Sequence, residues 1–197
     1  MTYVMTSSPP RTRMVESTAL LIRERGVTGT GMRDIAEHAR APRGSLQHYF
    51  PEGKDQVVSE ALVLVGDQVT AWLAKVLAAA EPTPARAVVA KMFRGWRRAL
   101  VDSDYLAGCP IVGTITDAAA NDQLRDAAAQ AFDRWSVALA AVLRRGGLTK
   151  ARAERVAVLT ISALEGAIVL ARAQRRLGAF DDVARELDQY LASLVKT

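Results

Sequence analysis

Apolar residues recur at helical spacing along almost the whole chain, and proline and glycine fall between the periodic segments. The last segment shows the pattern clearly, with a stripe made of Val183, Leu187, Tyr190 (or Leu191) and Leu194. No alternation of apolar and polar residues is long enough for a strand. Alanine is abundant and aromatic residues are few, as in helical proteins. The sequence therefore predicts an all-α chain of about nine helices.

Prolines, glycines and capping residues set the expected helix boundaries. Pro10 suits the first turn of a helix, and Gly26 suits the end of one. The expected helices cover about residues 9–25, 32–39, 43–50, 56–80, 85–101, 121–145, 149–177 and 181–196. Residues 108–120 are expected to be either irregular or a short helix interrupted by glycine.

Charge and cysteine usage restrict the class of protein. The chain of 197 residues carries a formal net charge of +5, which permits a polyanionic partner without establishing one. The single cysteine, Cys109, rules out an internal disulfide and fits a reducing compartment. The N-terminus lacks a signal-peptide pattern, and no window is expected to approach the roughly 18 apolar residues of a membrane span. We expect a cytoplasmic protein without a membrane partner.

Two short helices near the N-terminus are joined by the tight turn Arg40-Ala41-Pro42. This arrangement favours a helix-turn-helix, whose second helix can lie in the major groove of DNA. Leu46 and Phe50, four residues apart on the second helix, are expected to hold it to a three-helix core.

Most residues of the second helix have side chains that end in a polar group. Arginine can read guanine, glutamine can read adenine, and hydroxyl groups can bond to phosphates. The alternative interpretation is a solvated helical face, but two short helices in tandem and a basic flank favour DNA binding. The polar residues are Arg43, Ser45, Gln47, His48 and Tyr49.

The run TGTGMRDIAEHARAPRGSLQHYFPEGKDQVV resembles the DNA-binding segment of TetR-family transcriptional regulators. More narrowly it is similar to the LmrA/YxaF-like branch, in which a glycine precedes the lysine after Phe-Pro. The motif covers about residues 11–60, and GCPIVGTITDAA resembles another segment of that branch. The resemblance implies a homodimeric repressor of double-stranded operator DNA. It would have a DNA-binding domain at residues 1–54 and a ligand-binding and dimerisation domain at residues 55–197.

The resemblance also implies roles for individual residues. Family members usually have tyrosine where this chain has Gln47, so adenine readout would replace a phosphate or thymine contact. The residues expected to face the groove are Arg43, Ser45, Gln47 and His48. The residues expected to hold phosphates are Thr30, Tyr49 and Lys54.

Catalytic signatures are missing from the sequence. Both histidines lie in the DNA-binding segment, and no phosphate-binding loop, metal-spaced His/Cys cluster or nucleophile elbow is present. We expect no enzymatic activity, no cofactor and no metal site.

The resemblance places several aromatic residues around a central cavity for an unknown small-molecule inducer, expected to be mostly apolar. Ordinary core packing is the alternative for each of them. Glu165 interrupts an apolar run, and it could instead pair with Arg172 or face a partner subunit. For Cys109 the alternatives are a small buried hydrophobic residue, which is favoured, and a redox sensor. The candidate ligand-binding residues are Trp72, Phe93, Trp96, Cys109, Thr114, Trp135 and Glu165.

The helix expected over residues 149–177 is apolar nearly all round, which is typical of a buried helix. Together with the last helix it could form a four-helix interface across a two-fold axis. The alternative is that both are internal helices of a monomer. The expected dimer contacts are Leu164, Ile168, Leu187, Tyr190 and Leu194. Two other functions stay open: a DNA-binding protein of this fold without a ligand, and an enzyme or carrier on a helical scaffold.

Overall fold

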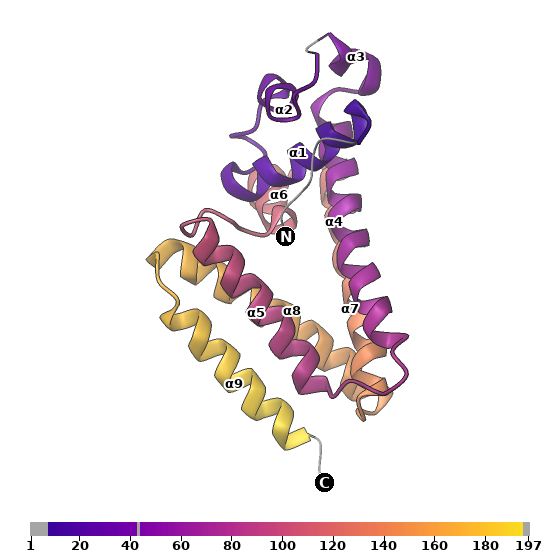
Figure 1. The fold of residues 1–197 in the computed structure, drawn as a ribbon, viewed down its shortest axis with the longest axis vertical. Helices are drawn as coiled ribbons and strands as arrows, with labels where there is room; N and C mark the ends of the chain where they lie inside the picture. Colours follow the sequence, from indigo (N-terminus) through magenta and orange to yellow (C-terminus); the bar gives the residue numbers. More distant parts are fainter. Residues whose placement is uncertain (1–7, 43, 195–197) are drawn as a thin grey trace. The chain divides into compact units, whose positions relative to one another are not determined.

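The computed structural model describes residues 8–42 and 44–194, within which the chain forms nine α-helices and no strand (Figure 1). The all-α prediction is confirmed, and residues 108–120 contain a regular helix. The helices are α1 (Pro10–Arg25), α2 (Met32–His38), α3 (Ser45–Tyr49), α4 (Lys54–Leu77), α5 (Ala85–Asp102), α6 (Pro110–Ala118), α7 (Asp122–Arg145), α8 (Lys150–Gln174) and α9 (Gly178–Leu194).

The chain divides into two compact units. The N-terminal unit contains the described residues up to Asp67 together with Pro110–Ala131. The C-terminal unit contains Gln68–Cys109 and the described residues from Phe132 onward. Helices α4 and α7 each contribute residues to both units. The unit that holds α2 and α3 is therefore larger than residues 1–54, because α6 packs with the N-terminal helices.

The N-terminal unit is built around an apolar core shared by α1, α2, α3 and the start of α4. Met14, Ile35 and Phe50 are completely buried in it. Arg13 of α1 fixes the end of α2, because its guanidinium donates hydrogen bonds to the carbonyl oxygens of Ala39 (2.9 Å) and Arg40 (3.3 Å). These bonds satisfy carbonyl groups that a helix end leaves without partners.

Helix α6 lies against α1 within this unit (Figure 1). The Asp117 carboxylate of α6 accepts a hydrogen bond of 3.1 Å from the Thr28 backbone N–H in the α1–α2 turn. The turn begins at Gly26, whose φ of 73° is in the left-handed region. A Cβ atom at Gly26 would lie 2.2 Å from the Asp117 carboxylate, so a larger residue would displace that side chain and also strain the backbone.

The C-terminal unit packs α5, α8 and α9 side by side with parts of α4 and α7. Phe93 of α5 and Phe180 of α9 meet in this core, with ring centroids 5.3 Å apart. At the other end of the unit, Arg145 donates hydrogen bonds to the carbonyl oxygens of Ala79 (2.7 Å) and Ala80 (3.2 Å). These bonds hold the α4–α5 connection against the end of α7.

Helices α4 and α8 are long and apolar enough, by length and composition alone, to cross a membrane. Their mean hydropathies reach 1.4 and 1.8, so the expectation that no window approaches a membrane span is wrong. Long helices that pack in the core of a soluble protein pass the same test. In α8 the hydropathy is high because apolar residues occupy an exposed face as well as the buried one.

Candidate nucleic-acid interface

Helices α2 and α3 are both attached to the core of the N-terminal unit. Ile35 and Ala36 of α2 are completely buried, and Leu46 of α3 is 9% exposed. Phe50, directly after α3, is also completely buried and closes the helix by donating its N–H to the Leu46 carbonyl oxygen at 2.8 Å. The expected anchoring by Leu46 and Phe50 is confirmed. Because α3 is only five residues long, these anchors fix which of its sides faces outward.

The outer face of α3 consists of the exposed Gln47 and His48, flanked by the half-buried Ser45 and Tyr49. The Ser45 hydroxyl donates a 2.6 Å hydrogen bond to the Pro42 carbonyl oxygen, which braces the turn before the helix. The His48 and Tyr49 rings meet edge to face, with centroids 5.1 Å apart. The fold thus brings four of the predicted DNA-binding residues onto one short helix.

The Gln47 side chain has hydrogen-bonding groups that are left over after its bond to Pro51. Its amide nitrogen donates a long hydrogen bond of 3.4 Å to the Pro51 carbonyl oxygen. The side-chain carbonyl oxygen and the second N–H are the acceptor and donor pair that adenine requires. A long, exposed bond is readily exchanged for a base contact.

Basic residues occur on the segments before and after α3. Lys54 is the first residue of α4, half-buried at the positive end of the helix dipole, where backbone N–H groups also attract anions. Arg33 and Arg40 are exposed on α2 and after it. Arg43, predicted to read a base, lies outside the described residues.

Thr30 differs from its predicted role. Its side chain is completely buried, and its hydroxyl donates a 2.7 Å hydrogen bond to the Gly26 carbonyl oxygen. A hydroxyl in this position does not reach a phosphate, so Thr30 shapes the α1–α2 turn instead. The N-terminus of α2 is capped by Asp34, which accepts a 2.9 Å bond from the Gly31 N–H.

Two positioning residues give no sign in the sequence. Arg13 holds the end of α2 through Ala39, 26 positions away, and Asp117 holds the turn before α2 through Thr28, 89 positions away. An arginine or an aspartate with a partner that distant leaves no local pattern in the sequence.

The residues predicted to bind a ligand do not all come together. Trp135 is buried, and Trp72 and Trp96 are half-buried, all in the C-terminal unit. Phe93 is buried in the contact with α9. Thr114 belongs to the N-terminal unit, where it is completely buried and donates a 2.8 Å hydrogen bond to the Pro110 carbonyl oxygen.

Glu165 and Cys109 form a buried pair in the C-terminal unit. Burial raises the pKa of the Glu165 carboxyl to about 7, and a hydrogen bond with the Cys109 thiol opposes part of this rise. One carboxyl oxygen of Glu165, Oε2, is buried and has no hydrogen-bond partner within the described residues. Cys109 itself is 4% exposed. A buried acceptor left unsatisfied is costly, so this oxygen is available to a hydrogen-bond donor.

Three of the predicted dimer contacts pack inside the chain itself. Leu164, Ile168 and Leu187 are buried in the chain's own core. Tyr190 and Leu194 are half-buried against the same core. The opposite side of α8, which we call its outer face, is exposed and apolar. It consists of Val158, Leu159, Ser162, Gly166, Val169 and Leu170.

Within residues 8–42 and 44–194, no group of three or more His, Cys, Asp or Glu side chains could hold a metal ion.

Comparison with known proteins identifies two families along the chain. Residues 15–61 match the family described as "Bacterial regulatory proteins, tetR family". Residues 84–186 match the "Transcriptional regulator LmrA/YxaF-like, C-terminal domain".

Curated relatives cover nearly the full chain. The HTH-type transcriptional regulator Rv0196 of Mycobacterium tuberculosis is 41% identical over 188 residues, which are 92% of this chain and 94% of that protein. The HTH-type transcriptional regulator LmrA of Bacillus subtilis is 25% identical over 167 residues, with 84% and 88% covered.

Solved structures agree on the fold. A TetR transcriptional regulator from Legionella pneumophila superposes with a TM-score of 0.82 at 20% identity, covering 94% of this chain and 98% of that one. A TetR-family regulator from Cytophaga hutchinsonii gives 0.72 at 26% identity, covering 95% and 96%. The two family matches, the relatives and the α2–α3 geometry agree: the chain belongs to the tetR family of bacterial regulatory proteins, in its LmrA/YxaF-like branch, and is a DNA-binding transcriptional regulator.

Proposed function

We propose that this regulator is a cytoplasmic homodimeric repressor that binds a palindromic operator and leaves it when a small molecule binds the C-terminal unit. The observation that supports it most is the outer face of α3. Polar side chains project from a short helix whose other side is fixed by Leu46 and Phe50. A recognition helix needs both properties, because base readout requires polar tips in a fixed position.

In this proposal Gln47 and His48 read base edges, since they are the exposed residues of α3. Ser45, Tyr49 and Lys54 contact phosphates at the rim of the groove, and Arg43 adds a further base or phosphate contact. Phosphate contacts supply most of the affinity and its salt dependence, whereas base contacts supply discrimination.

The outer face of α8 supports a dimer. Val158, Leu159, Val169 and Leu170 are between 44% and 55% exposed, which is unusual for four large apolar residues on one helix. Gly166 lies between them, and a Cβ atom there would meet nothing within 4 Å. A mid-helix glycine costs about 1 kcal/mol relative to alanine. A second copy of α8 crossing at Gly166 explains both the glycine and the apolar residues around it.

Ligand binding is proposed for the aromatic and acidic residues of the C-terminal unit. Trp72 and Trp96 are half-buried, and Glu165 carries the unsatisfied oxygen. A ligand with an apolar body and one hydrogen-bond donor suits these groups. Thr114 is not included, because it belongs to the N-terminal unit, and Phe93 is not, because it lines a groove at α9 that none of the tryptophans line.

The ligand signal is proposed to reach the DNA-binding helices through α4 and α6. Helix α4 runs from Lys54 to Leu77 and so contributes to both units. Helix α6 directly follows Cys109, the partner of Glu165, and its Asp117 holds the turn before α2. A shift of either helix changes the separation of the two recognition helices in a dimer. Coupling of this type typically amounts to about 1–3 kcal/mol.

The test is a footprint on the DNA around the gene for this protein, followed by gel shifts with the protected site and a scrambled duplex. We expect a pseudo-palindrome whose half-sites are about one helical turn apart, bound far more tightly than the scrambled DNA. Equal affinity for both duplexes would contradict sequence-specific regulation.

A compound screen then tests the inducer. Compounds that release the operator should also change tryptophan fluorescence, because Trp72, Trp96 and Trp135 all lie in the C-terminal unit. Linkage requires saturating operator to weaken binding of the same compound. Specific operator binding that no compound releases would support a regulator of the same fold without a ligand.

A further inference from the structure

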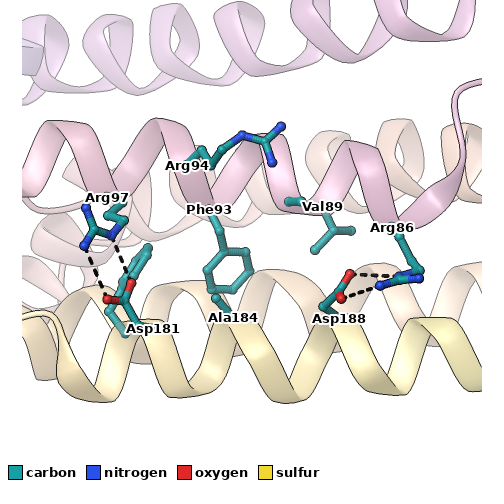
Figure 2. Close-up of a pocket in the computed structure, with 10 residues that line it drawn as sticks. Arg86, Val89, Phe93, Arg94, Arg97, Asp181, Ala184 and Asp188 are labelled. Atoms are coloured by element: carbon teal, nitrogen blue, oxygen red, sulfur yellow. Dashed lines mark hydrogen bonds and ion pairs between the residues drawn. The ribbon is translucent and has the colours of Figure 1, made fainter.

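A shallow groove of about 210 Å³ opens between α5 and α9 in the C-terminal unit (Figure 2). Its floor is apolar, because Val89, Phe93 and Phe180 lie in it with at most 4% of each residue exposed. Ala90 and Ala184 border it and are too small to fill it. The tryptophans proposed to bind the inducer do not line this groove.

Two ion pairs bridge the helices at the two ends of the groove (Figure 2). Arg86 donates two hydrogen bonds to the Asp188 carboxylate, at 2.9 and 2.6 Å. Arg97 does the same to Asp181, at 3.1 and 3.4 Å. The hydrogen bond from Arg86 lowers the pKa of Asp188, so this carboxylate stays charged. Both pairs use the bidentate geometry for which arginine and a carboxylate are matched.

A third arginine lies between them without a counterpart. Arg94 also lines the groove, but its side chain points away from α9 (Figure 2), and within the described part of the chain it has no hydrogen bond or ion pair. On α9 the residue that lines the groove between the two aspartates is Ala184. The residues that line the groove thus include three arginines and two aspartates, which leaves a net charge of +1.

We propose that this groove binds a small organic acid. The carboxylate of the acid pairs with Arg94, in the place of a third aspartate, and its apolar part covers the floor at Phe93. The exposed Arg94 side chain is free to turn toward the groove. The volume is below the roughly 300–1,000 Å³ of drug-sized pockets, which limits the ligand to a single ring or a short chain. An unpaired arginine beside an apolar surface selects an acid over its neutral amide.

The experiment uses the full-length protein, with phenylacetate as the probe and phenylacetamide as its neutral match. Amide resonances of Ala90, Arg94 and Ala184 are followed by NMR during titration. We expect saturable shifts with phenylacetate and binding about tenfold or more weaker with phenylacetamide, because a charge-assisted pair is lost. Arg94→Ala should lower the affinity for phenylacetate by a similar factor, and Arg94→Lys should lower it by less.

Two further variants make the test specific. Ala184→Asp adds a carboxylate on α9 between the two aspartates. This carboxylate should compete with phenylacetate for Arg94 and lower its affinity. Arg98→Ala removes an exposed arginine of α5 that does not line the groove, and it should bind phenylacetate as the wild type does. The acid site is wrong if phenylacetate does not bind, if phenylacetamide binds equally well, or if Arg94→Ala and Ala184→Asp both leave its affinity unchanged. Operator gel shifts with Arg94→Ala keep this result separate from the regulatory function, since the variant should still bind DNA.

Discussion

Helices α3 and α8 each bury one face in the chain and leave the other exposed, but the exposed faces differ in chemistry. The outer face of α3 carries an amide and an imidazole, Gln47 and His48, on a helix of five residues. The outer face of α8 carries Leu159 and Val169 on a helix of 25 residues. Polar tips on a short helix suit the edges of bases, whereas apolar side chains along a long helix suit another helix.

A helix face is available to a partner only where packing inside the chain leaves it uncovered. On α3 the polar residues stand out against Leu46 and Phe50, so the outward side is evident from the residue types. On α8 both sides are apolar, and only the burial of Leu164 and Ile168 shows that the opposite side is available.

The largest expected effect comes from placing a charge on the outer face of α8. Leu159→Glu should convert the dimer to a monomer, because a carboxylate would be buried without a partner at the crossing of the two helices. Loss of the second half-site should then lower operator affinity about a hundredfold or more. Native mass spectrometry and gel shifts measure the two effects.

Val137→Glu is the matched control for this change. Val137 of α7 is 72% exposed and does not belong to the outer face of α8, so the variant should stay dimeric. A monomeric mass for the unaltered protein, or dissociation by both variants alike, would contradict the proposed interface.

A smaller effect is expected on the outer face of α3. Gln47→Ala should cost roughly 1–3 kcal/mol of operator binding and relax the preference at one base position, because one bidentate base contact is lost. Lys54→Ala should weaken all sequences about equally and reduce the salt dependence. Quantitative gel shifts on single-base variants of the operator, at two salt concentrations, separate the two roles. Unchanged base preference in Gln47→Ala would exclude it as a reading residue.

Glu165 is an ionisable residue of α8 that is largely buried, and it makes the stability of the protein depend on pH. Burial raises its carboxyl pKa from the usual 4.5 to about 7, so the folded protein holds the proton more tightly than the unfolded chain does. The stabilisation is present below about pH 4.5 and is lost as the pH rises through 7. It amounts to about 3 kcal/mol at most.

The variant Glu165→Gln should remove this pH dependence, and Glu154→Gln, an exposed position on the same helix, should retain it. Urea unfolding at pH 5 and pH 8, at one protein concentration, provides the measurement. If the free energy of unfolding changes with pH equally in the wild type and in Glu165→Gln, the pKa of the Glu165 carboxyl is not raised.

The smallest expected effect concerns how α3 is positioned. Asp117→Ala removes the acceptor of the Thr28 N–H and should cost about 0.5–1.5 kcal/mol of stability. Because the α1–α2 turn positions α2 and α3, operator affinity should fall a few-fold without a change in base preference. Asp126→Ala, an exposed acid of α7 in the same unit, serves as control. Equal thermal midpoints for the two variants would show that α6 does not hold the turn.

The order of the helices and the outer face of α3 could be read from the sequence. Both depend on interactions between residues close in the chain: apolar residues three or four apart, proline and glycine at helix ends, and polar tips between Leu46 and Phe50. The same residues carry the resemblance to the TetR family, so the fold and the function class followed from local patterns.

Only the tertiary structure decided which side of each apolar helix is free. Periodicity gives the faces of a helix but not the neighbour that covers each one, so Leu164, Ile168 and Leu187 were assigned to a dimer although the chain buries them itself. It also could not show that Thr30 turns inward to Gly26, or that Asp117 reaches Thr28 across 89 positions. Such contacts form only when distant segments pack, because their energy depends on burial and distance in the folded chain and not on neighbours in sequence.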